Sequence, residues 1–281
     1  SRWVSLEWRW GGMTHRRLQN HSRVLLFSCL AVVLLFLALI PSPADSAPLG
    51  DVTFSPGAYI IDMGTYPYTT ERLNYGLIYD LVVNYQVPVY WAINPAKAKD
   101  GIDFTAGGKN YRGGSLIIPA EYVAAKPGLT TVIATWRTKG AKVDGPIASG
   151  FTAPIYDYIT SFPNAVLDLQ NGDIISAAFY TPAQVPTSSY RLGTPLDLNS
   201  CDDIYAMPHA DPQNWDNATE TTFNNFIVNG GYLWAACHAV SAIESPAPSY
   251  LGFYYLTTNG TLDWNQHGDG SAPYSYTAHT D

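Results

Sequence analysis

The sequence has few cysteines and few basic side chains. Three cysteines in 281 residues are too few for a disulfide-rich scaffold, and no dense cysteine and histidine cluster of the zinc-binding kind occurs. Lys and Arg number 15 against 23 Asp and Glu, which gives a net charge of −8. This balance argues against binding to nucleic acid or to anionic lipid. We therefore expect no nucleic-acid partner, no metal and no other cofactor.

Only one long apolar run is present, at Val24–Ile40. The basic segment Arg16–Arg23 precedes it, and Pro41–Pro43 followed by small residues ends it. This order is typical of a secretory signal peptide, with cleavage near Ser46 or Ala47. At roughly 17 residues the run is also near the lower limit for a membrane span, so an uncleaved anchor is the alternative.

Four segments are expected along the chain. Residues 1–12 precede the first methionine and are interpreted as upstream translated sequence, and residues 13–47 form the signal peptide. Residues 48–265 form one α/β domain, and residues 266–281 begin a segment that continues into a longer multidomain protein. Without residues 1–47, ten Lys and Arg remain against 21 Asp and Glu, a net charge of −11. We expect a secreted or cell-envelope protein.

Strand-like and helix-like patterns alternate in the first part of the domain. Ala58–Met63 and Val87–Ile93 are apolar, strand-like runs on either side of an amphipathic helix at Thr70–Tyr85. A strand–helix–strand order predicts parallel pairing with a right-handed crossover. The glycine-rich region that follows predicts a β-hairpin inserted at about residues 100–120. Beyond it we expect a strand at Thr130–Thr135, a short helix at Pro154–Phe162 and a surface loop at Thr181–Asn199.

The most regular pattern comes near the end of the domain. Its elements are the strand Asp203–Met207, a helix capped by Asp216 or Thr219 and stopped by Gly230-Gly231, the strand Tyr232–Ala236 and a helix from His238 to Glu244. Together the two units predict a three-layer α/β sandwich around a mostly parallel sheet, flavodoxin-like or class I amidotransferase-like, with the hairpin as an insertion. Ligands of such sheets bind at the carboxyl ends of the strands.

Cys237 stands at the turn from a strand to a helix, where the helix start favours a thiolate. It is the candidate nucleophile, although a free cysteine is also often a small buried apolar residue. His209 or His238 is the candidate imidazole, and Asp62 is a weaker candidate for the orienting carboxylate. Cys201 precedes one predicted strand and Cys237 ends the other, so parallel strands would hold the sulfurs about 15 Å apart. We expect two free thiols.

Three segments carry a resemblance to a known family: Pro208–Asp211, Asn229–Gly231 and the turn Ala235–Ala239. They resemble the class I glutamine amidotransferase-like superfamily, in its DJ-1/PfpI and ThuA-like branch, over residues 200–245 and more loosely over 57–95. The resemblance implies that Cys237 is a nucleophile, that the His238 N–H helps to hold an oxyanion and that the His238 side chain joins the catalytic set. The whole chain is similar to the amino-terminal domain of exported bacterial surface proteins.

Two departures from this family bear on activity. Ala235 and Ala239 replace the glycines that flank the family's cysteine, and the family's downstream His-x-Glu pair is not found. These departures favour, slightly, a non-catalytic ligand-binding or structural module, whereas the intact Cys-His pair favours a Cys-dependent hydrolase or amidase. Gly64, Asp211 and Ala239 are candidate contacts for a small-molecule, peptide or carbohydrate ligand.

Overall fold

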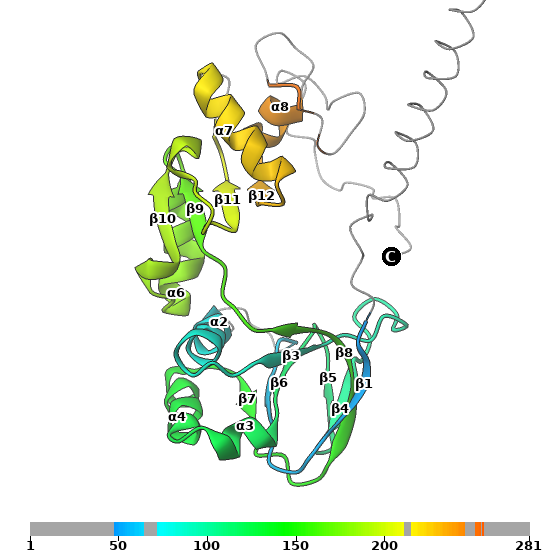
Figure 1. Cartoon of the computed structure of the whole chain (residues 1–281). Coiled ribbons are helices and arrows are strands. Elements are labelled where there is room, and N and C mark those ends of the chain that lie inside the picture. The colour runs from blue at the N-terminus through cyan, green and yellow to red at the C-terminus, as the bar shows by residue number, and fades with distance from the viewer. Residues whose placement is uncertain (1–47, 65–71, 211–214, 245–250, 254, 256–281) are drawn as a thin grey trace, which may run out of the picture. The chain divides into compact units, whose positions relative to one another are not determined.

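The computed structural model describes residues 48–64, 72–210, 215–244, 251–253 and 255 (Figure 1). The predicted segments 1–12, 13–47 and 266–281 lie outside these residues. The described residues all belong to one compact unit that begins at Pro48.

A six-stranded sheet makes up the first half of this unit. Its strands are β1 (Gly50–Phe54), β2 (Tyr59–Ile61), β3 (Val89–Ala92), β6 (Leu116–Ile118), β7 (Val143–Asp144) and β8 (Phe151–Ile159). They lie in the order β1-β8-β3-β6-β2-β7, and every neighbouring pair is antiparallel. The expectation of a mostly parallel sandwich is therefore wrong.

The error has a specific physical cause. β2 and β3 do flank a helix, but β6 lies between them and pairs antiparallel with both, through Ile117 with Ile60 and with Tyr90. Strand and helix alternation predicts the direction of two strands without saying which strand lies between them. Ile117 is fully buried, so β6 has the apolar pattern of a central strand, and its pairing partners could not be read from that pattern.

The two faces of this sheet are covered differently. Helix α2 (Arg72–Tyr79), the π-helical turn η1 (Asp80–Asn84), α3 (Ala120–Ala125) and α4 (Leu129–Lys139) cover one face. The predicted hairpin is present as β4 (Phe104–Ala106) and β5 (Lys109–Tyr111), and it covers the other face (Figure 1). Phe104 and Tyr111 stack with ring centroids 5.0 Å apart, and Phe104 also stacks on Phe151 of β8. The hairpin is thus part of the core.

Two element predictions in this half are wrong. Thr130–Thr135 is part of α4, whose buried Leu129, Ile133 and Trp136 recur at helical spacing. The β-branched residues around them give this segment the composition of a strand. Pro154–Phe162 is not a helix, because β8 runs through Pro154 and pairs with β1 and β3.

The second half contains a four-stranded parallel sheet. Its strands are β9 (Ala165–Asp168), β10 (Tyr190–Gly193), β11 (Ile204–Met207) and β12 (Tyr232–Ala235), in the order β10-β9-β11-β12. Helices α7 (Asn217–Val228) and α8 (His238–Glu244) pack on one face. Asp216 caps α7, as expected, by accepting the Thr219 N–H at 2.9 Å. The predicted strands Asp203–Met207 and Tyr232–Ala236 correspond to β11 and β12. Their parallel pairing is confirmed, but only within this smaller sheet.

The other face of the parallel sheet is covered by a continuous helical segment. This segment consists of α5 (Gly172–Ile175), the π-helical turn η2 (Ser176–Tyr180) and α6 (Thr181–Ala183). The predicted surface loop at Thr181–Asn199 instead contains α6, β10 and the short 3-10 turns η3 (Thr187–Ser189) and η4 (Pro195–Asp197). The segment also contacts the first half, because Arg72 of α2 donates a hydrogen bond to the Ala178 carbonyl.

Candidate functional site

Cys237 occupies a sharp turn between β12 and α8. Its φ is +55°, in the left-handed region, although it is not a glycine. This conformation costs an ordinary residue about 1–2 kcal/mol, and such residues cluster at active sites. The side chain is exposed. The predicted strand–cysteine–helix turn is therefore present, with the thiol facing outward.

The turn is closed by its own backbone. The Ala239 N–H donates to the Ala236 carbonyl and the Val240 N–H to the Cys237 carbonyl, both at 3.2 Å. His238, the predicted partner, is the first residue of α8. The two bonds engage the second and third N–H groups of α8, so of its first three N–H groups only that of His238 is left to face a ligand beside the thiol.

His209 lies at the same edge of the parallel sheet. Met207 of β11 pairs with Ala235 of β12, and the Ala236 N–H extends this ladder to the Met207 carbonyl at 3.1 Å. His209 and Cys237 each follow that register pair by two residues. Neighbouring strands lie about 4.8 Å apart, so both residues leave the sheet at one place. His209 is exposed.

The neighbouring strand β9 brings a further carboxylate to this edge. Asp168, at the carboxyl end of β9, is buried and accepts the Tyr205 hydroxyl at 2.5 Å and the Gln170 N–H at 2.9 Å. Burial, together with the Asp168 charge, raises the pKa of Tyr205. Asn171 then donates its side-chain amide to the His209 carbonyl. Sequence reasoning missed Asp168 and Asn171, although the run Ala165–Asp168 has the pattern of a buried strand ending in a carboxylate.

Asp62 belongs to a different sheet from Cys237. It follows β2, is buried, and its Oδ2 lies 2.7 Å from Nζ of Lys109. Lys109 also lies 2.7 Å from Asp144, which accepts the Tyr111 hydroxyl at 3.0 Å. The hydrogen bonds and charges of the two carboxylates outweigh the effect of burial and raise the pKa of Lys109. This network joins the hairpin to β2 and β7, so it accounts for Asp62 as a structural residue.

The candidate ligand contacts have local roles. The Gly64 N–H donates to Asp62 Oδ1 at 2.9 Å, and a Cβ at Gly64 would lie 2.9 Å from the Arg112 carbonyl oxygen. Gly64 therefore permits close approach of two backbone segments. Ala239 is fully buried beneath the Cys237 turn. Asp211 lies outside the described residues.

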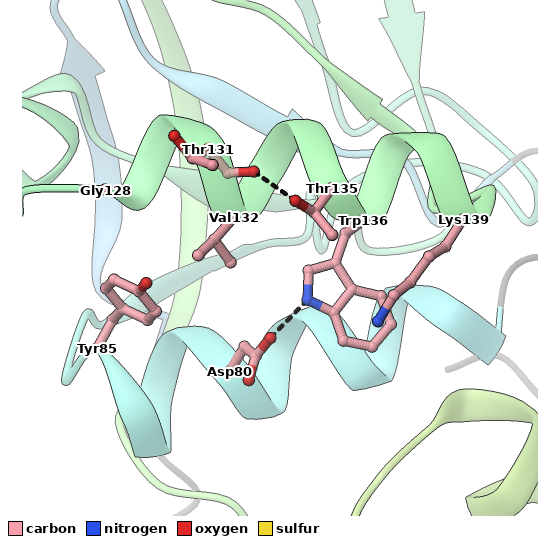
Figure 2. Close-up of a pocket in the computed structure, with 8 residues that line it drawn as sticks. All are labelled: Asp80, Tyr85, Gly128, Thr131, Val132, Thr135, Trp136 and Lys139. Atoms are coloured by element: carbon pink, nitrogen blue, oxygen red, sulfur yellow. Dashed lines mark hydrogen bonds between the residues drawn. The ribbon is translucent and has the colours of Figure 1, made fainter.

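A separate groove of about 300 Å³ lies between η1 and α4 (Figure 2). In it the Trp136 indole N–H donates to Asp80 at 2.6 Å, and Nζ of Lys139 lies 3.9 Å from the centre of the indole ring. Tyr85 and the exposed Thr131 and Thr135 complete its rim. None of the candidate catalytic residues lines this groove.

In the described part of the chain, no group of three or more His, Cys, Asp or Glu side chains could hold a metal ion. Among the same residues, no helix is long and apolar enough to cross a membrane. Comparisons with protein-family models, with curated proteins and with solved structures find no match.

Proposed function

We propose that this protein is a Cys-dependent hydrolase that acts outside the cytoplasm on an amide or ester carbonyl, with Cys237 as its nucleophile. The single observation that carries the proposal is the left-handed backbone of Cys237, with its thiol exposed between a parallel strand and a helix start. A strained turn of this kind presents a nucleophile clear of its own backbone. The resemblance to the amidotransferase-like superfamily assigns the same residue the same role.

The proposed reaction has two balanced steps. The Cys237 sulfur attacks the carbonyl carbon and gives its proton to an imidazole, and the oxygen takes negative charge beside the His238 N–H. The bond to the leaving group breaks, and the imidazole returns the proton to that group, which leaves a thioester. Water then hydrolyses the thioester to a carboxylic acid and restores the thiol. His209 is the proposed imidazole, because its strand neighbours that of Cys237.

The strand that leads to Cys237 also supports a ligand with an apolar face. Tyr232 and Trp234 of β12 are 72% and 47% exposed, although both are aromatic. β12 is the last strand in the order of the parallel sheet. Exposed rings of this kind pack against peptide side chains or sugar rings. A peptide or a glycoconjugate is therefore the proposed class of substrate.

A second candidate function is a binding module without catalysis. It is favoured by Asp62, which is held by Lys109 in the other sheet and so is accounted for without a role at Cys237. It is also favoured by the two alanines that flank the turn, since Ala239 is packed into the core. Under this alternative the Cys237 edge binds its ligand without forming a covalent bond.

The two candidates differ in their response to an activated ester. The full chain is mixed with p-nitrophenyl acetate, and the release of p-nitrophenolate and the mass of the protein are followed together. The hydrolase predicts a burst of p-nitrophenolate and one acetyl group on Cys237, both absent in Cys237→Ser and both retained in Cys201→Ser. Acetylation that is equal at Cys201 and Cys237, without turnover, would contradict catalysis and favour the binding module.

A further inference from the structure

We propose that Asn171 is a positioning residue of the Cys237 site, and that its side-chain amide fixes the main chain of His209 beside the Cys237 turn. This inference rests on the proposed function. Its structural basis is the hydrogen bond from Asn171 Nδ2 to the His209 carbonyl, which joins the loop after β9 to the loop after β11.

The position of Asn171 makes this bond unusual. Asn171 is the residue before the first turn of α5, where an asparagine side chain ordinarily accepts an N–H from its own helix. Here the side chain makes no such capping bond. The Asn171 backbone carbonyl accepts the Ile174 N–H at 3.2 Å, while the side chain is directed at His209. The Asn171 side chain could cap α5, but it bonds instead to the loop that follows β11 at the edge of the sheet.

The loop that carries Asn171 is itself held in place. Gln170, its neighbour, donates its N–H to Asp168, which also accepts the Tyr205 hydroxyl of β11 at 2.5 Å. A Cβ at Gly172 would lie 2.6 Å from Cβ of Leu167, so the chain turns tightly against β9. The carboxyl end of β9 is therefore bonded to β11 through Tyr205, and the loop after β9 is bonded to the loop after β11 through Asn171.

These ties leave the His209 backbone little freedom. Pro208 before it has a fixed φ, and Ala210 after it is fully buried in the same apolar cluster as Ala239. Ala239 lies two residues beyond Cys237, so one cluster anchors both sides of the site. Asn171 holds the remaining group, the His209 carbonyl. The direction in which the His209 side chain leaves the main chain depends on this backbone.

The test uses Asn171→Ser and Asn171→Ala in the full chain, each alone and combined with His209→Gln. Serine is a good helix cap and alanine a poor one, but neither reaches the His209 carbonyl. Alkylation of Cys237 by iodoacetamide is measured at pH 6 and pH 8 by peptide mapping, with Cys201 as the reference within each molecule. Asn229→Ser is the matched control, because Asn229 donates to a carbonyl of its own helix, at the opposite edge of the sheet.

We expect both Asn171 variants to slow Cys237 alkylation at pH 6 about tenfold, part of the roughly 10²- to 10⁴-fold that a well-placed base contributes. The loss should be smaller at pH 8, where free thiols ionise unaided. It should not add to the loss in His209→Gln. Asn171→Ser and Asn171→Ala can differ in thermal stability because serine is the better helix cap. If both nevertheless slow Cys237 alkylation equally, the effect comes from positioning rather than from capping.

Two other results would overturn the inference in distinguishable ways. If His209→Gln slows alkylation and the Asn171 variants do not, Asn171 has no positioning role and the proposed function stands. If the Asn171 loss adds fully to the His209→Gln loss, Asn171 acts through another group. If His209→Gln itself has no effect, the proposed imidazole is wrong, and the inference fails with it.

Discussion

Met207 of β11 pairs in register with Ala235 of β12. Because the two strands are parallel, the residues that follow this pair leave the sheet at one edge, His209 from β11 and Cys237 from β12. Of these two residues, only Cys237 has a left-handed backbone. The register and the strained turn together are what make this edge a candidate site.

The strain at Cys237 can be measured by replacing it. Glycine adopts a positive φ without cost, whereas alanine does not. We expect Cys237→Gly to be more stable than Cys237→Ala by about 1 kcal/mol, measured by urea unfolding. Ala134→Gly, in the exposed interior of α4, is the control and should lose about 1 kcal/mol. If the glycine variant is less stable than the alanine form at both positions, Cys237 does not have a left-handed backbone.

Gly76 marks the contact between α2 and α6. A Cβ at this position would lie 2.0 Å from the Ala183 carbonyl oxygen and 2.4 Å from the Trp136 ring. We expect Gly76→Ala to lower the free energy of unfolding by about 1–3 kcal/mol, although alanine ordinarily stabilises a helix by about 1 kcal/mol relative to glycine. Gly108→Ala, where a Cβ meets nothing within 4 Å, should lose only the cost of its positive φ. A gain in stability at Gly76 would contradict the packing of the two helices.

Lys109 neutralises a buried carboxylate. The Asp62 side chain is only 6% exposed, and its Oδ2 lies 2.7 Å from Nζ of Lys109. We expect Lys109→Met to lower the free energy of unfolding by roughly 1–3 kcal/mol, because the buried Asp62 loses its ion pair with Lys109. Adding Asp62→Asn should recover part of this loss. Lys139→Met, at an exposed lysine over Trp136, should have a smaller effect. An equal effect at the two lysines would mean that the Asp62 pair has no special role.

The pairing of Asp202 with Arg191 should make the free energy of unfolding depend on pH in acid. Burial alone would raise the pKa of Asp202, but the Arg191 guanidinium and the Asn199 N–H lower it below its ordinary value. A carboxyl group with a lowered pKa stabilises the fold above its unfolded pKa of about 3.9, and this stabilisation is lost as the pH falls through the folded pKa. Urea unfolding from pH 5 to pH 2 should therefore show a steeper loss of stability for the wild type than for Asp202→Asn. Equal slopes would contradict the role of the pair.

Local features of the fold were predictable from the sequence. The hairpin, the cap at Asp216 and the strand–cysteine–helix turn depend on residues close together in the chain, and all three predictions are confirmed. The prediction of two free thiols is also confirmed, since β11 and β12 are parallel and the cysteines lie at their opposite ends. Each of these predictions depends on the spacing of residues along the chain or on local chemistry.

Contacts between distant segments were not predictable. Nothing in Leu116–Ile118 shows that it pairs with both β2 and β3, yet that pairing makes the first sheet antiparallel. The ion pair between Lys109 and Asp62 depends on how the hairpin folds back onto β2. Asn171 could be read only as a helix cap until its bond to the His209 carbonyl was seen.

A comparison of the two described thiols, Cys201 and Cys237, tests whether Cys237 is activated. The reduced full chain is treated with iodoacetamide at pH 7, and the alkylation rates of Cys201 and Cys237 are measured by peptide mapping. Both side chains are exposed, so access alone predicts similar rates. We expect Cys237 to react at least about tenfold faster, and this advantage to disappear in His209→Gln. Equal, slow alkylation of both thiols would contradict this expectation.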